Sequence, residues 1–353
     1  MVFGLPCDTR CVVDAPVLPF DAFLLLSFGG PEQPADVMPF LRRVTGGRGI
    51  PDDRLAEVVA HYDHFGGRSP INDQNRALSA ALRREFADRG IDLPLYWGNR
   101  NWDPLLADEL ARIAADGHRR IAVFITSAYS SYSGCRQYRE NLAAAATEAG
   151  VEDVLDFVRL PHYWANPGFV APFADGLRDA LATLPGGSAT VFVTHSIPLA
   201  MDASSGADGH AYTTQHDETA RLVRAGAGLS DDEPDLVFCS RSGPPAVPWL
   251  EPDVNAHLTE LAAAGVPGVA VVPIGFVSDH MEVRFDLDTE AAETAAALEL
   301  PFARVATPGT DARFVRAIVD LLEQAAGAPT PPRCAPGCCP NPRGHRPALC
   351  GSD

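Results

Sequence analysis

Three carboxylates follow one another at intervals of four residues: Glu282, Asp286 and Glu290. In a helix, residues four apart lie on the same face, so these side chains would form a line. Like charges at this spacing repel by roughly a few tenths of a kcal/mol for each exposed pair, and a purely structural helix gains nothing from them. A solvated face is the ordinary alternative. A cation moving along the helix would be attracted by all three, and the pattern therefore predicts metal handling.

Two histidines accompany this line of carboxylates. His280 lies just before Glu282, and His195 ends the apolar run Val-Phe-Val-Thr further back in the chain. Imidazole and carboxylate together suit a borderline divalent metal such as iron or zinc. A histidine at the position of His195 can also serve only to cap its strand. Its place at the carboxyl end of an apolar run, with Pro198 stiffening the turn, favours a site in a cleft.

The eight cysteines are concentrated towards the end of the chain. Cys334, Cys338, Cys339 and Cys350 fall in the last twenty residues, whereas Cys135 is isolated in the middle. A disulfide framework would be spread through a domain, and clustered thiols in a reducing cytosol more often bind metal. Three thiolates of the tail and one distant cysteine would complete a site for zinc or a [2Fe–2S] cluster. Four free thiols are the alternative.

The elements that must position these groups alternate between strands and helices. Strands are predicted at Ala22–Phe28, Leu93–Gly98, Arg120–Ser127, Val154–Leu160, Ala189–His195, Leu236–Ser240, Val269–Phe276 and Phe302–Ala306. Helices are predicted between them, for example at Asn75–Arg89, Leu105–Ala115 and Tyr138–Ala149. Continuous apolar strands indicate a parallel sheet that is covered on both faces. Their alternation with helices predicts an α/β doubly wound architecture.

The predicted strands fall into two comparable sets, before and after about residue 150. We therefore expect a disordered extension over 1–20, Rossmann-like lobes over 21–150 and 151–324, and a Cys-rich tail over 325–353. The default active site of such a fold is the interlobe cleft outside the carboxyl ends of the strands. Segments 28–31, 126–133, 195–198 and 275–280 all follow predicted strands and would meet there.

Composition restricts the classes of function. The formal net charge of −18 over 353 residues argues against nucleic acid, since phosphates would be repelled, but an acidic field concentrates cations. No apolar run reaches the ~18–20 residues that span a bilayer. Asp8, Arg10 and Asp14 interrupt any signal-peptide core. These features predict a cytoplasmic protein.

Seven motifs, in order along residues 22–310, give the chain a resemblance to the ferrochelatase family, which inserts ferrous iron into porphyrins. The motifs are Leu24–Pro31, Gly66–Pro70, Tyr132–Asn141, Thr194–Pro198, Ser240–Pro244, Trp249–Pro252 and Asp279–Glu282. The resemblance implies two Rossmann-like lobes that grip the macrocycle between them.

The resemblance also implies roles for individual residues. His195 and Glu282 match the metal-binding and catalytic pair, and Asp286 and Glu290 match an acidic line for metal delivery or proton removal. Ser69 and Tyr138 match positions that contact the porphyrin. Cysteine-bearing members of the family hold a [2Fe–2S] cluster with one internal and three C-terminal ligands. The matching residues here are Cys135, Cys334, Cys338 and Cys339, with Cys350 as a substitute for one of the adjacent pair.

The chain looks nearest to the actinobacterial branch of the family, whose substrate is coproporphyrin III; protoporphyrin IX is the alternative substrate. Arg42, Arg43 and Arg48 could pair with four propionates. Phe28 stands where some coproporphyrin enzymes have a tyrosine that ligates product iron. The resemblance further implies Fe²⁺ as a substrate. We also expect a downstream haem-pathway enzyme as a partner, and a monomer.

Two other classes of function remain open at this stage. A metal-dependent hydrolase would use His195, His280 and Glu282 to activate water. A haem or metal carrier would bind its ligand without turnover.

Overall fold

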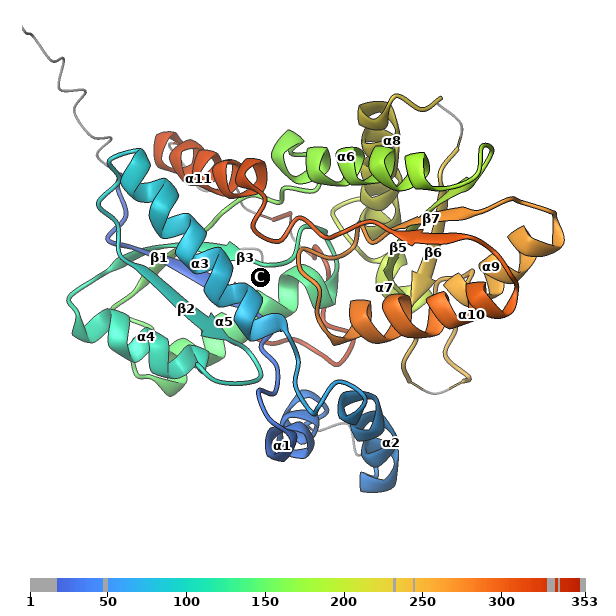
Figure 1. The fold of residues 1–353 in the computed structure, drawn as a ribbon. Coiled ribbons are helices and arrows are strands. Elements are labelled where there is room, and N and C mark those ends of the chain that lie inside the picture. The colour runs from blue at the N-terminus through green and yellow to red at the C-terminus, as the bar shows by residue number, and fades with distance from the viewer. Residues whose placement is uncertain are drawn as a thin grey trace, which may run out of the picture.

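A computed structural model describes residues 18–46, 50–230, 233–243, 245–328, 334–335 and 337–349. Within these residues the strands form two four-stranded parallel sheets (Figure 1). The first sheet contains β1 (Ala22–Ser27), β2 (Leu95–Asn99), β3 (Arg120–Ile125) and β4 (Asp156–Arg159), in the order β2-β1-β3-β4. The second contains β5 (Ala189–His195), β6 (Asp235–Cys239), β7 (Val269–Val272) and β8 (Phe302–Arg304), in the order β6-β5-β7-β8. The same order recurs in both sheets, and the α/β fold class is confirmed.

Helices cover both faces of each sheet. Those of the first half are α1 (Pro34–Val44), α2 (Asp52–Asp63), α3 (Ile71–Asp88), α4 (Leu106–Ala115), the π-helix η1 (Tyr132–Arg136) and α5 (Gln137–Glu148). Those of the second half are α6 (Pro167–Thr183), α7 (Leu199–Ala203), α8 (Ala211–Ala227), α9 (Val254–Ala263), the π-helix η2 (Val283–Ala291), α10 (Ala292–Ala297) and α11 (Ala312–Gly327).

Strand β1 shows how the sequence produces this layering. Its six residues, Ala-Phe-Leu-Leu-Leu-Ser, are all buried, and successive side chains of a strand point to opposite faces. Phe23 and Leu25 pack with α3 and α11 on one face, whereas Leu24 and Leu26 pack with α4 and α5 on the other. A strand covered on both sides must be apolar throughout, which explains its continuous run.

The two sheets share one hydrophobic core. Side chains of α3, α6, α8 and α11 pack against strands of both sheets in a single cluster. α11 lies at the end of the second half but contacts α3 of the first half, as well as α6 (Figure 1). The second sheet has a further cluster with α9, η2 and α10 on its other face. The shared core holds the two strand edges, and the residues on them, in a defined relation.

Two elements of the structure extend across the expected boundaries of the lobes and tail. β4 pairs with β3 in the first sheet, so this sheet extends to Arg159 and passes the expected boundary near residue 150. α11 continues to Gly327, three residues beyond the expected end of the second lobe at residue 324. Most of the expected N-terminal extension lies outside the described residues. Phe20, at its end, is buried in the core.

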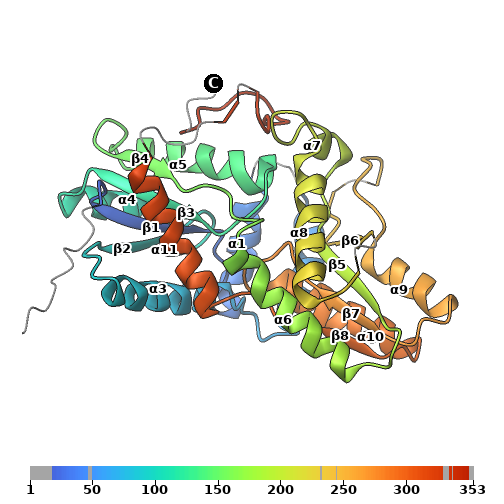
Figure 2. The same ribbon diagram turned by 90° about the horizontal axis from the view of Figure 1, so that it is seen from above.

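The described tail returns to the body of the protein. The backbone N–H of Gly206, after α7, donates to the Cys339 sulfur at 3.2 Å, and the backbone N–H of Leu349 donates to the Arg139 carbonyl in α5 at 3.4 Å. Figure 2 shows this segment lying across the space between α5 and α7. Among the described helices, none is long and apolar enough to cross a membrane.

Candidate functional site

His195 and Glu282 come together at the carboxyl edge of the second sheet. His195 is the last residue of β5 and pairs with Cys239 of β6, and Glu282 directly precedes η2. The imidazole Nε2 lies 3.4 Å from Glu282 Oε1. The Nδ1 atom faces the Ser196 carbonyl, so Nδ1–H donates there and Nε2 is the atom presented to Glu282. Solvent reaches both side chains, which are 32% and 45% exposed.

The two groups form an ion pair. Burial lowers the pKa of His195, but the Glu282 charge and hydrogen bond, together with the Ser196 carbonyl, outweigh burial and raise it to about 9. Burial likewise raises the pKa of Glu282, but the nearby His195 lowers it to about 2. At neutral pH the pair is therefore imidazolium and carboxylate. Nε2 becomes a base or a metal ligand only after its proton leaves.

The line of carboxylates continues along η2, which is a π-helix over Val283–Ala291 and not the α-helix that the spacing suggested. Asp286 lies inside it and still feels the charges of both Glu282 and Glu290. The wider turn of a π-helix is rare and frequent at functional sites. Val283 and Leu287 of the same helix are fully buried in the core of the second sheet. This packing anchors the helix beneath its acidic side.

Asp286 has the properties of a proton acceptor near neutral pH. Burial raises its pKa to about 7, because a hydrogen bond from the Ser240 hydroxyl compensates only in part and the Glu282 charge adds to the effect. Burial also raises the pKa of Glu290. A carboxyl that titrates near the working pH can both take up and release protons.

His280 supports Glu282 at the start of the line. Its Nδ1 accepts the backbone N–H of Glu282 at 3.2 Å, and its ring packs edge-on against Phe276. Burial lowers the pKa of His280, so the ring is neutral and orients the Glu282 backbone.

The two residues expected to contact a porphyrin are both buried. Ser69 packs against Gly30, and its hydroxyl accepts the backbone N–H of Ile71 at 3.4 Å. A side chain at Gly30 would come within 2.8 Å of the Ser69 Cβ, so this contact requires glycine. Tyr138 lies under a guanidinium, that of Arg100.

Arg100 is a candidate site residue that the sequence reasoning missed. It directly follows β2, and its guanidinium carbon lies 4.3 Å from the centroid of the Tyr138 ring and 5.4 Å from that of Phe28. Its Nε donates to Asn141 Oδ1 at 2.7 Å. The signal that could have found it is a basic residue at the carboxyl end of a predicted strand.

Apolar residues of α1 and α2 pack next to the start of η2. Val37, Phe40, Leu55 and Tyr62 form a cluster with Met281, which lies between the two site residues His280 and Glu282. A neighbouring pocket of about 440 Å³ is lined by Phe65, Arg68, Pro70, Asp73, Gln74, Asp279, Met281 and Arg284.

Two of the arginines proposed from the sequence as propionate partners lie on the exposed surface of α1. Arg42 pairs with Asp52 at 2.7 Å, and both side chains are exposed. Arg43 is also exposed, and Arg48 lies outside the described residues.

The four cysteines proposed as cluster ligands lie next to one another. Cys135 contacts Cys334, which in turn contacts Cys338, and the sulfurs of Cys338 and Cys339 are 3.7 Å apart. Cys339 has a left-handed backbone (φ 53°), and its thiol is buried. Contacts with Cys135 and Cys338 lower the pKa of Cys334. The contact with Cys334, together with burial, raises the pKa of Cys135. Cys350 lies outside the described residues.

The thiols adjoin pairwise and do not surround one point. Within the described ranges, no group of three or more His, Cys, Asp or Glu side chains is arranged to hold a single metal ion. The pairwise arrangement nevertheless brings sulfurs from sequence positions about two hundred residues apart to one place beside α5.

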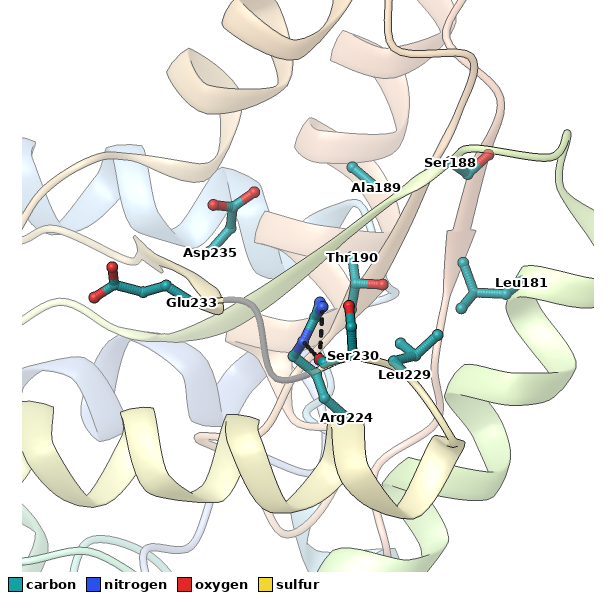
Figure 3. A pocket seen from close by; sticks show the side chains of 9 residues that line it. All are labelled: Leu181, Ser188, Ala189, Thr190, Arg224, Leu229, Ser230, Glu233 and Asp235. Carbon is teal, nitrogen blue, oxygen red and sulfur yellow. Dashed lines mark hydrogen bonds between the residues drawn. The ribbon is translucent and has the colours of Figure 1, made fainter.

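A second pocket lies away from these groups. This pocket has a volume of about 300 Å³. Its lining includes Ala189 and Thr190 at the start of β5 and Asp235 at the start of β6 (Figure 3). Arg224 lies in it and donates to the Ser230 carbonyl. It opens at the amino ends of the strands, opposite His195, and so does not belong to the candidate site.

Comparison with known proteins decides the family. The ferrochelatase family model matches residues 20–326. The chain belongs to the ferrochelatase family. It is 54% identical to a coproporphyrin III ferrochelatase of Streptomyces griseus, over 95% of this chain and 97% of the relative. It is also 52% identical to a coproporphyrin III ferrochelatase of Frankia alni, over 92% and 87% of the two chains. This ferrochelatase-family chain shares its fold with a solved structure of SirB from Bacillus subtilis with Fe³⁺, at a TM-score of 0.55, 13% identity and coverage of 87% and 95%.

Proposed function

We propose that this ferrochelatase inserts Fe²⁺ into coproporphyrin III. The observation that carries the proposal is the His195–Glu282 pair, with Asp286 beside it, on the carboxyl edge of the second sheet. Relatives that share about half of the residues over nearly the whole chain are named for this reaction. Protoporphyrin IX is the competing substrate.

The charge state of the pair suggests how the residues act. A porphyrin loses two pyrrole N–H protons as the metal enters, so the site must accept positive charge and release protons. Fe²⁺ as substrate competes with the proton on His195 Nε2, and capture of the metal releases that proton. Glu282 is ionised throughout and attracts the cation.

Asp286 is suited to receive the protons. Its pKa of about 7 lets it accept a proton at neutral pH, and Ser240 fixes one of its oxygens. Glu290, further along η2, would pass metal or protons between Asp286 and the surface, since burial raises its pKa in the same direction.

Arg100 is the proposed anchor for a substrate propionate. A guanidinium that packs against two aromatic rings is held in a fixed plane, and with Nε bound to Asn141 its Nη donors would meet the propionate. Coproporphyrin III carries four propionates where protoporphyrin IX carries two, so cationic partners at the site favour it.

The substrate is tested by anaerobic incubation of the protein with Fe²⁺ and either porphyrin, following the metalloporphyrin spectrum. We expect a higher kcat/KM for coproporphyrin III. A higher value for protoporphyrin IX would contradict the substrate, and binding without turnover would indicate a carrier.

We also propose that Cys135, Cys334, Cys338 and Cys339 hold a [2Fe–2S] cluster. Four cysteine thiolates are the usual ligands of such a cluster, and the pairwise contacts of these thiols are consistent with two irons sharing four ligands. When bound, the cluster would supply an iron–sulfur group that can exchange one electron. The chain's own contribution is to bring the tail against α5 and to bury Cys135 and Cys339. Contacts with neighbouring thiols lower the pKa of Cys334, which favours its thiolate form.

A cytoplasmic location and a monomeric state stay predictions. A reducing compartment would keep the thiols available for a cluster. Cell fractionation and light scattering test these two predictions.

A further inference from the structure

Arg139 in α5 carries a buried charge that lacks an ordinary partner. The residue is 1% exposed and is the largest of the fully buried side chains. Its Nε, Nη1 and Nη2 atoms are all inaccessible and make no hydrogen bond of normal geometry within the described part of the chain. A buried cation without a partner destabilises the folded state by roughly several kcal/mol, unless an opposite charge lies close by.

A neighbouring arginine shows what an ordinary buried pair looks like. Arg136 is also buried, but its Nε lies 3.2 Å from Glu140 Oε1 on the same helix. Glu140 is further engaged by the Tyr132 hydroxyl and by the Asn341 side chain. The nearest helical carboxylate is therefore committed elsewhere, and among the described residues no carboxylate forms an ion pair with Arg139.

The groups that do lie beside Arg139 are thiols. Cys135 is four residues earlier, one helical turn away, and Cys334 of the tail adjoins it. The charges of Cys135 and Cys334 act on Arg139, and the positive charge of Arg139 in turn acts on Cys334 and Cys339. One thiol before α5, Cys135, and one thiol of the tail, Cys334, therefore lie next to the Arg139 guanidinium.

We propose that Arg139 is a buried counter-cation of the thiolate group Cys135, Cys334, Cys338 and Cys339, and that it stabilises a [2Fe–2S] cluster there and raises its reduction potential. The inference rests on the cluster proposed above. Four thiolates with two irons and two sulfides carry net negative charge, so a cation inside the same low-dielectric region lowers the cost of burying them. Reduction adds a further electron, and the cation favours the reduced form for the same reason.

The experiment compares four full-length proteins: the parent, Arg139→Met, Arg139→Lys, and Arg84→Met on the exposed face of α3 as the matched control. Each is assayed for iron and acid-labile sulfide, for the rate of cluster loss to a chelator, and for the potential of the visible chromophore. We expect Arg139→Met to lose iron about 10-fold to 100-fold faster, as for other groups that support metal ligands. Its potential should become more negative, Arg139→Lys should restore part of both effects, and Arg84→Met should match the parent.

Thermal unfolding of the chelator-treated proteins separates this role from simple packing. Without the cluster, Arg139 is an unpaired buried charge, so the apo form of Arg139→Met should unfold at the same temperature as the apo parent or higher. An apo Arg139→Met that unfolds at a lower temperature would show a packing role and overturn the inference. So would equal cluster loss and equal potential in Arg139→Met and the parent. A parent that contains neither iron nor sulfide would instead overturn the cluster itself.

Discussion

Replacing Glu282 by Gln should lower the pKa of His195 strongly. The structure raises that pKa from 6.5 to about 9, and the Glu282 charge and hydrogen bond are the largest raising causes. The full difference corresponds to about 3 kcal/mol. The Glu282 side chain is 45% exposed, and screening by solvent reduces the pair's coupling to roughly 1–2 kcal/mol. We therefore expect the pKa to fall by about one or more in Glu282→Gln, because burial then opposes the charged imidazole with less compensation.

The assay is a pH titration of the histidine ring signals by nuclear magnetic resonance in metal-free protein. Glu290→Gln is the matched control, because Glu290 is not among the main causes of the raised His195 pKa. This substitution should leave the pKa of His195 nearly unchanged. Stability provides a second readout. A raised histidine pKa stabilises the fold fully below about pH 6.5, and this contribution is lost as the pH rises to about 9. A His195 pKa that is equal in the parent and in Glu282→Gln would refute the ion pair.

Four further outcomes follow from the same geometry. Asp286→Asn should stabilise the fold by about 1–4 kcal/mol at pH 8, measured by urea unfolding, and have no such effect near pH 4. The reason is that folding raises the pKa of Asp286 to about 7, so the charged carboxylate is costly in the folded state. The same change in unfolding free energy at both pH values would contradict this. Arg100→Ala should raise KM for coproporphyrin III about tenfold or more with a smaller change in kcat, which steady-state kinetics would check. Co²⁺ affinity of the parent should increase with pH towards about 9, as His195 loses its proton, and calorimetry in buffers of different ionisation heat should detect the released proton. Cys334→Ser should lose iron and sulfide while retaining the fold by circular dichroism; full retention of the cluster would exclude Cys334 as a ligand.

The strands were predictable because burial on two faces leaves a direct trace in the sequence. β5 was predicted with its observed bounds, Ala189–His195, since its run of apolar residues ends at a histidine. β7 was predicted to reach Phe276 but ends at Val272. Pro273 has no N–H to donate to the ladder and so ends the strand. The following Gly275 packs closely against Thr194 of β5, where a side chain would come within 2.1 Å.

The site was predictable where chemistry depends on residue type and spacing, and hidden where it depends on tertiary contacts. The line of carboxylates could be read from their spacing alone. That η2 is a π-helix could not, because local propensity does not separate the two helix types. The cation–π stack of Arg100 on Tyr138 joins two segments that are distant in the chain. The burial of Arg139 next to Cys334 arises only when the tail returns to α5, and no short-range pattern records it.

Insertion of Fe²⁺ into coproporphyrin III by His195→Ala tests the central claim most directly. The imidazole Nε2 faces Glu282 at 3.4 Å, and its loss would remove the proposed metal ligand and base. We expect the anaerobic insertion rate to fall by roughly 10²–10⁴-fold, while porphyrin binding, measured by fluorescence quenching, stays close to that of the parent. Retention of the parental insertion rate in His195→Ala would contradict the assignment of this site.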